Sequence, residues 1–131
     1  METRFRADLI AWLRTDPALS ARINAVEEES PVSASPPWIG IAASASRDWG
    51  AKDMKGREVR IALELVDRRD EDSSSASAAI VEALEARIAA LPPAQSRYRV
   101  VVTRFRRSRA ERRKRNLRAI LLEYEFGLIA A

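Results

Sequence analysis

The sequence lacks two residue types that carry much of protein chemistry, cysteine and histidine. Without cysteine there can be no disulfide bond, no thiolate metal ligand and no thiol nucleophile. Without histidine, the commonest general base and the commonest zinc ligand are missing too. Glycine is scarce, with four in 131 residues, and no stretch matches a phosphate-binding glycine loop or a nucleophile elbow. We therefore expect no enzyme, no metal site and no cofactor.

Long apolar runs are also absent, since no stretch approaches the roughly 18 residues that a membrane-spanning helix needs. Residues 1–16 carry charge throughout and lack the apolar centre of a signal peptide. The 131 residues, 47% of them apolar, fit a single domain over 1–131 with a modest core, because many of the apolar residues are alanine. We expect a soluble protein that is made in a reducing cytoplasm and enters no membrane.

Positive charge is concentrated in one short segment. Residues 104–118 hold nine Arg or Lys against a single acid, Glu111, a local net charge of +8, whereas the whole chain carries only +4. An unpaired guanidinium cannot be buried, so this segment must face water, phosphate or the carboxylates of a partner. The candidate contact residues are Arg104, Arg106, Arg107, Arg109, Arg112, Arg113, Lys114 and Arg115.

The N-terminal part predicts a helical segment over residues 3–29. Asp16-Pro17 can end a first helix and begin a second, with Asp16 as its cap and Pro17 at its first position. The Pro- and Ser-rich residues 30–37 predict a turn. The apolar residues of the helical segment recur every three or four positions: Phe5, Leu9, Trp12, Leu13, Leu19, Ile23 and Val26.

Alternation of apolar and polar residues predicts two β-hairpins, over residues 38–69 and 97–129, and the basic tip at 104–118 belongs to the second. Residues 73–91 between them predict a helix that Pro92-Pro93 ends and that residues 73–75 can cap. The order α(α)ββαββ predicts an α+β domain. Its antiparallel four-stranded sheet would be covered by the N-terminal helical segment and the longer helix. Open sheet edges can pair with neighbours, which favours assembly.

The charged clusters allow several interpretations. The basic hairpin could dock an acidic partner protein, follow a nucleic-acid phosphate backbone or simply keep the protein in solution. The acidic residues at 27–29 and 67–72 lack the ligand spacing of a calcium loop, so we expect them to be solvated. Glu123 and Glu125 share one face of the last strand, and we expect them to lie opposite basic side chains such as Arg99.

The chain resembles a family of small tail-completion proteins of tailed phages and gene transfer agents, long listed as the domain of unknown function DUF3168. The resemblance lies in residues 9–23 and 47–65, and the later helix and final strand pair follow in the same order. The sequence departs from the family pattern at Val66-Asp67, where an aromatic and a small polar residue are usual, and in its Arg-rich hairpin. The residues of the second segment that match are Trp49, Lys52, Gly56 and Glu58.

The resemblance implies a structural virion protein, a tail terminator. Such a subunit forms a ring, usually of six copies, that caps the tail tube and joins it to the head connector in the tail or neck region. Sheet edges, or the loop with Trp49 and Lys52 and the nearby Glu58, would meet the neighbouring copy, although Trp49 could equally serve local packing. The basic hairpin would face the tube, the connector or DNA in the lumen. The alternative is a stand-alone nucleic-acid-binding module that uses the Arg-rich hairpin.

Overall fold

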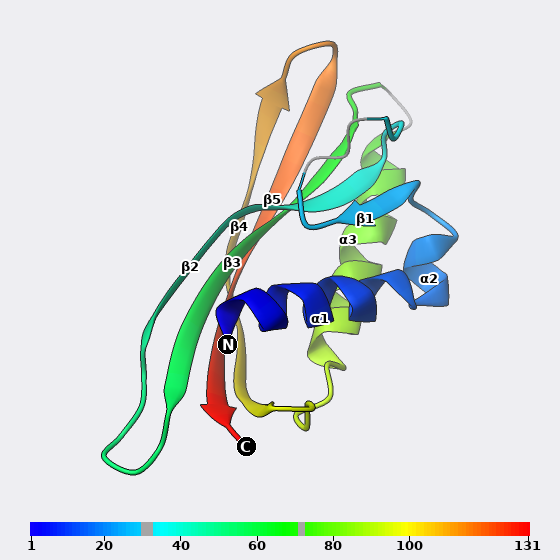
Figure 1. Ribbon diagram of the computed structural model, residues 1–131. Helices are drawn as coiled ribbons and strands as arrows, with labels where there is room; N and C mark the ends of the chain where they lie inside the picture. The colour runs from blue at the N-terminus through cyan, green and yellow to red at the C-terminus, as the bar shows by residue number, and fades with distance from the viewer. Residues whose placement is uncertain (30–32, 71–72) are drawn as a thin grey trace.

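The computed structural model describes residues 1–29, 33–70 and 73–131. The five strands form one sheet in the order β1-β2-β3-β5-β4, and α1 and α3 lie on one side of it (Figure 1). The elements are α1 (Glu2–Arg14), α2 (Pro17–Ser20), β1 (Ala25–Glu27), β2 (Trp38–Asp48), β3 (Gly56–Arg68), α3 (Ser73–Ala89), β4 (Tyr98–Arg113) and β5 (Leu117–Ala130).

The described residues form an α+β fold with three helices, but the predicted antiparallel four-stranded sheet is wrong. β1 adds a fifth strand and pairs in parallel with the start of β2, so the sheet is mixed. β1 lies inside the stretch for which the sequence predicted helix. The spacing of Leu19, Ile23 and Val26 matched a helical stripe, and three residues are too few to show the alternation of a strand.

Two predicted features extend beyond the described residues. The turn over 30–37 includes residues 30–32, and the acidic cluster at 67–72 includes residues 71 and 72, all of which lie outside the described part. The side chain of Ser73, one of the expected helix caps, lies outside it as well. The predicted cap at Asp16 is confirmed, since its carboxylate accepts a hydrogen bond from the backbone N–H of Leu19.

The hydrophobic core lies between the sheet and the helices. β3 is the central strand, and its apolar side chains on the helix side are at most 1% exposed. Burying one such side chain contributes about 1.5–3 kcal/mol, which holds the helices on the sheet. The main contributors are Phe5, Leu9 and Leu13 of α1, Val59, Ile61, Leu63 and Leu65 of β3, Ile80, Leu84 and Ile88 of α3, and Leu122, Tyr124, Phe126 and Leu128 of β5.

One pair of side chains ties α1 to α3. The Arg87 guanidinium lies 3.3 Å from the centroid of the Trp12 ring. The Trp12 indole N–H donates to the Arg87 carbonyl at 2.8 Å, and the Arg87 Nε donates to the Trp12 carbonyl at 3.0 Å. A cation stacked on an indole contributes about 1 kcal/mol, so this contact fixes the helix layer as one unit.

The sheet has two unequal edges among the described strands. β4 is outermost along its whole length, whereas β1 covers only the first residues of β2 and leaves the rest of that strand at the other edge. β4 has two register irregularities, after Val100 and after Phe105, and carries many arginines. β2 has one irregularity, after Ile41, and its residues 42–46 are all Ala or Ser. Charges and bulges discourage unspecific strand pairing, so the β2 edge is the more open one.

Candidate functional site

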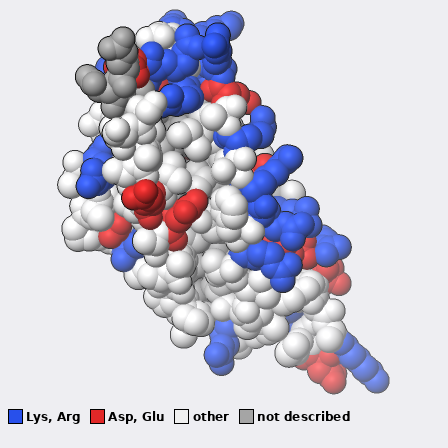
Figure 2. Space-filling view, turned by 180° about the vertical axis from the view of Figure 1, so that it is seen from behind, with Lys and Arg blue, Asp and Glu red and all other residues white. Residues whose placement is uncertain are grey.

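The basic segment occupies the end of the β4–β5 hairpin. Arg113 pairs with Leu117, which leaves residues 114–116 as the turn. Residues 103–110 of β4 are exposed whichever way their side chains point. Figure 2 shows Lys and Arg side chains gathered at the upper end of the view and along one side, with acidic side chains between them. The predicted contact residues therefore divide between a strand and a turn.

Ion pairs extend across the sheet on the face opposite the helices, and we call this network the charged face. Carboxylates and guanidinium groups meet there because the strand register places them side by side, as with Arg47 opposite Glu58 and Arg107 opposite Glu123. The charged face consists of Glu58, Glu64, Glu111, Glu123 and Glu125 with Arg47, Arg60, Arg106, Arg107, Arg109 and Arg113.

Glu58 is a buried carboxylate at the end of the charged face where β3 begins. It is 5% exposed, and it accepts hydrogen bonds from Arg47 Nη2 at 2.6 Å and from Arg60 Nε at 3.3 Å. The hydrogen bond from Arg47 lowers the pKa of the Glu58 carboxyl, and Arg60 adds to the effect. Glu58, predicted as an interface residue, therefore has its carboxylate satisfied within its own subunit.

At the upper end, Arg113 joins two carboxylates. Its Nη2 lies 3.1 Å from Glu64, which is 4% exposed, and 2.7 Å from Glu111, to which Arg109 also donates at 2.9 Å. The hydrogen bond from Arg113 is the main cause that lowers the pKa of the Glu111 carboxyl. Two of the predicted contact arginines are thus held by the charges of their own chain.

Glu123 and Glu125 pair with β4, as predicted, but not with Arg99. Arg107 binds Glu123, and Arg106 lies 3.4 Å from Glu125. Arg99 instead lies opposite Ile129, because the register of a hairpin whose turn is at 114–116 brings later residues of β4 to the two glutamates.

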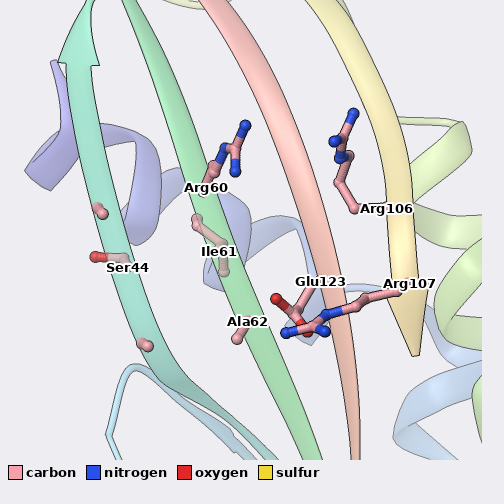
Figure 3. Close-up of a pocket in the computed structure, with 9 residues that line it drawn as sticks. Ser44, Arg60, Ile61, Ala62, Arg106, Arg107 and Glu123 are labelled. Carbon is pink, nitrogen blue, oxygen red and sulfur yellow. The ribbon is translucent and has the colours of Figure 1, made fainter. Parts of the chain in front are cut away.

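A shallow pocket of about 370 Å³ lies in the middle of the charged face. Ala43, Ala45 and Ala62 leave room for it, while Arg60 of β3 and Arg106 of β4 stand around it with β5 between their strands (Figure 3). Figure 3 also shows Arg107 and Glu123 lying together, and Arg60 and Arg106 are each paired with a glutamate. Because its charges are balanced, the pocket has little net attraction for an ionic ligand.

The end of the β4–β5 hairpin differs from the charged face. We call Arg112, Lys114 and Arg115 the cationic tip: all three are exposed, and their side chains make no hydrogen bond or ion pair with any residue that the structure describes. Arg104, farther from the turn on β4, is likewise exposed and has no hydrogen bond or ion pair with the described residues. Arg118, by contrast, donates to the Ser77 hydroxyl of α3 at 3.1 Å and so joins the strand to the helix layer.

Hydrogen bonds from Arg69, the residue after β3, hold the turn in place. The backbone N–H of Arg69 donates to the Asn116 carbonyl at 2.9 Å, and Arg69 Nη2 donates to Asn116 Oδ1 at 3.3 Å. Arg115 and Asn116 both have left-handed backbone angles, with φ of 63° and 59°. Asparagine accommodates this conformation, whereas for arginine it costs roughly 1–2 kcal/mol.

The remaining predicted interface residues lie in and beside the connection between β2 and β3. Lys52 is exposed in the turn. Trp49 packs on the sheet, because a Cβ at Gly127 would lie 2.7 Å from Trp49 Cζ3 and 3.1 Å from Val102 Cβ. The missing side chain at Gly127 therefore makes room for the indole, which remains 39% exposed. A glycine inside an alternating strand was the sequence signal for such a close approach.

Within residues 1–29, 33–70 and 73–131, no group of three or more acidic side chains could hold a metal ion. No helix in the described part of the chain is long and apolar enough to cross a membrane.

Comparison with known proteins gives one family and one shared fold. The family model described as tail completion protein gp17 matches residues 7–128. A chain of a solved structure, described as the virion of a native gene transfer agent particle, superposes with a TM-score of 0.79. The two chains are 19% identical over 96% of this chain and 94% of that one, which shows a common fold. A comparison with curated proteins finds no match.

Proposed function

The chain belongs to the family of tail completion protein gp17, and on this premise we propose that it is a tail terminator. In this role, a ring expected to hold six copies caps the tail tube and joins it to the head connector, in the neck region of a tailed phage or gene transfer agent. The subunits would be made in the bacterial cytoplasm and act by assembly, without a catalytic step. The fold shared with a chain of the gene transfer agent virion supports this role. Family membership favours it over a stand-alone nucleic-acid-binding module.

The observation that carries the ring is the pair of open edges on opposite sides of one sheet. β4 is outermost on one side and the later part of β2 on the other, among the strands described. An interface between two different surfaces repeats head to tail and closes when the rotation per copy divides a full turn. In the proposed ring, β4 of one copy lies along β2 of the next.

The connection between β2 and β3 would extend this contact. Trp49 offers a half-exposed indole there, and Lys52 is exposed in the same loop. Amphipathic aromatic residues of this kind are common anchors of protein interfaces. Glu58 would contribute indirectly, because it orients Arg47 and Arg60, whose side chains remain 70% and 59% exposed.

Native mass spectrometry and sedimentation of the full chain test the ring. We expect a closed oligomer of one size, and we expect Ala45→Arg to weaken it by placing a long side chain on the open β2 edge. Ala86→Arg is the matched control, because Ala86 is also an exposed alanine but lies on α3. A strictly monomeric protein at high concentration contradicts the ring. Electron microscopy of tail tubes mixed with the protein should then show a ring at the tube end, and bare tube ends would refute the capping role.

A further inference from the structure

We propose that the cationic tip binds the phosphate backbone of double-stranded DNA without reading its sequence. Arg112, Lys114 and Arg115 are the binding residues. This inference goes beyond the ring, because a single subunit can make the contact and the contact can be measured whether or not the ring forms.

The first support is the way the chain uses its own carboxylates. On the charged face, Arg106, Arg107 and Arg109 of β4 each have a glutamate within ion-pair distance. The three cations of the tip have no partner in the described part of the chain, although they follow within a few residues on the same hairpin. The tip therefore presents fully hydrated charge that a polyanion can neutralise without breaking an existing pair.

The second support is the geometry of the turn. Arg115 occupies a left-handed position, with φ of 63°, that glycine or asparagine would adopt more easily. The two hydrogen bonds from Arg69 to Asn116 hold the turn in place. A cation is thus kept at a strained position in a braced turn, and such pre-organisation reduces the entropy lost on binding.

The third support concerns the chemical class of the partner. Protein interfaces are centred on apolar or aromatic residues that bury area. Residues 112–116 are Arg, Arg, Lys, Arg and Asn, so the tip has no apolar anchor. A phosphate backbone needs none, because its binding free energy comes largely from the release of counterions. The tip therefore fits a nucleic acid better than an acidic protein surface.

The fourth support favours a duplex over a single strand. Proteins that hold single strands stack bases on aromatic side chains. The nearest aromatic residue on the hairpin, Phe105, is 46% exposed, but its ring meets Tyr124 edge to face with centroids 5.5 Å apart. It also lies on the strand, several residues before the turn. The tip thus offers charge without a stacking surface, which suits the regular phosphates of a duplex.

The size of the effect follows from the number of contacts. If each tip neutralises three phosphates of a duplex, log K falls against log salt with a slope of about −2.7 per subunit. The affinity of one tip is therefore weak at physiological salt and measurable at low salt. Several tips held together in an oligomer would bind more tightly by avidity.

Fluorescence anisotropy of a labelled DNA duplex, titrated with the full chain over a series of salt concentrations, tests the proposal. The test variant replaces Arg112, Lys114 and Arg115 by Ser. Its matched control replaces Arg106, Arg107 and Arg109 by Ser, which removes an equal number of positive charges from the charged face of the same hairpin. We expect the test variant to reduce the magnitude of the salt slope by about 2.7 per subunit and the control to leave most of the slope intact.

Four results overturn the proposal. They are no binding at low salt, equal loss in both variants, tighter binding of a single strand than of the duplex, and tip-dependent binding of polyglutamate that matches that of DNA. The last would assign the tip to an acidic protein partner. Native mass spectrometry of the same samples keeps this test separate from the ring, because loss of DNA binding in an intact oligomer concerns the tip alone.

Discussion

The charged face and the cationic tip draw on the same strand and the same residue type, yet their chemistry differs. Along the charged face, β5 places Glu123 and Glu125 opposite the arginines of β4. Nearer the turn, β5 supplies Leu117 and Arg118 instead, and the acids end before the cations do. An arginine is thus structural where a carboxylate of its own chain lies within ion-pair distance, as for Arg107 and Arg113, and available to a partner where none does. Composition alone does not separate the two cases.

The two regions should also differ in stability. Exposed ion pairs contribute about 0–1 kcal/mol each, so most pairs of the charged face are individually weak. The exceptions are Glu58 and Glu64, whose buried carboxylates depend on their arginines. We therefore expect substitutions on the charged face to affect folding and substitutions at the cationic tip to affect binding.

The largest loss of stability is expected from a substitution at Gly127, where the sheet contacts Trp49. Gly127→Val should lower the free energy of unfolding by about 2 kcal/mol or more, because the new side chain would overlap the Trp49 ring. Urea unfolding measures the change. In a Trp49→Ala background the same substitution should cost clearly less, since the indole is gone. An equal cost in both backgrounds would place the strain elsewhere.

A smaller effect is expected at Glu58. Glu58→Gln removes the charge that holds Arg47 and Arg60 and should lower the free energy of unfolding by about 1.5–2 kcal/mol. The serine variant of the cationic tip should change it by less than about 0.5 kcal/mol, because those side chains have no partner in the described structure. Urea unfolding measures both changes. Similar losses of unfolding free energy in the two variants would contradict the proposed difference between the charged face and the cationic tip.

Acid should reduce the contribution of the charged face to the free energy of unfolding, whereas the cationic tip should add no pH dependence. The pKa of the Glu58 and Glu111 carboxyls is lowered by their arginines, so as the pH falls the unfolded chain binds protons before the folded one does. Their stabilisation is present above the ordinary glutamate value of 4.5 and is lost as the pH falls below it toward the lowered folded values. Unfolding free energies measured from neutral pH down to acid should show this decline. Glu58→Gln should flatten it, whereas the tip variant should follow the native curve.

The smallest effect is expected at Arg115, and it has opposite signs for folding and binding. Arg115→Asn relieves the left-handed strain and should raise the free energy of unfolding by about 0.5 kcal/mol. The same change removes one phosphate contact and should weaken DNA binding. Chemical denaturation and anisotropy on one sample measure both. A loss of stability would show that the arginine side chain supports the turn.

Much of the architecture was predictable because it follows local patterns. The alternation of Val59, Ile61, Leu63 and Leu65 marked the central strand, and the spacing of Phe5, Leu9 and Leu13 marked α1. The resemblance to tail-completion proteins, carried by residues 9–23 and 47–65, also led to the right family, and that membership is confirmed.

What escaped prediction depended on partners that are distant in sequence. β1 is a strand because it pairs in parallel with β2, and the three residues Ala25-Val26-Glu27 alone do not predict that pairing. The partners of Glu123 and Glu125 depended on the hairpin register, and the register depended on where the turn lies. Alternation locates a strand, but it leaves open which residue of the next strand stands opposite.

The contact between Trp49 and Gly127 has a spectroscopic consequence. The chain has three tryptophans, and Trp12 lies under the Arg87 guanidinium, whereas the Trp49 indole is partly in water on the side of the sheet away from the helices. Intrinsic emission on excitation of the indoles thus contains a component that reports on this surface. When another macromolecule covers it, that component should move to shorter wavelength, so docking can be followed in the unlabelled native protein.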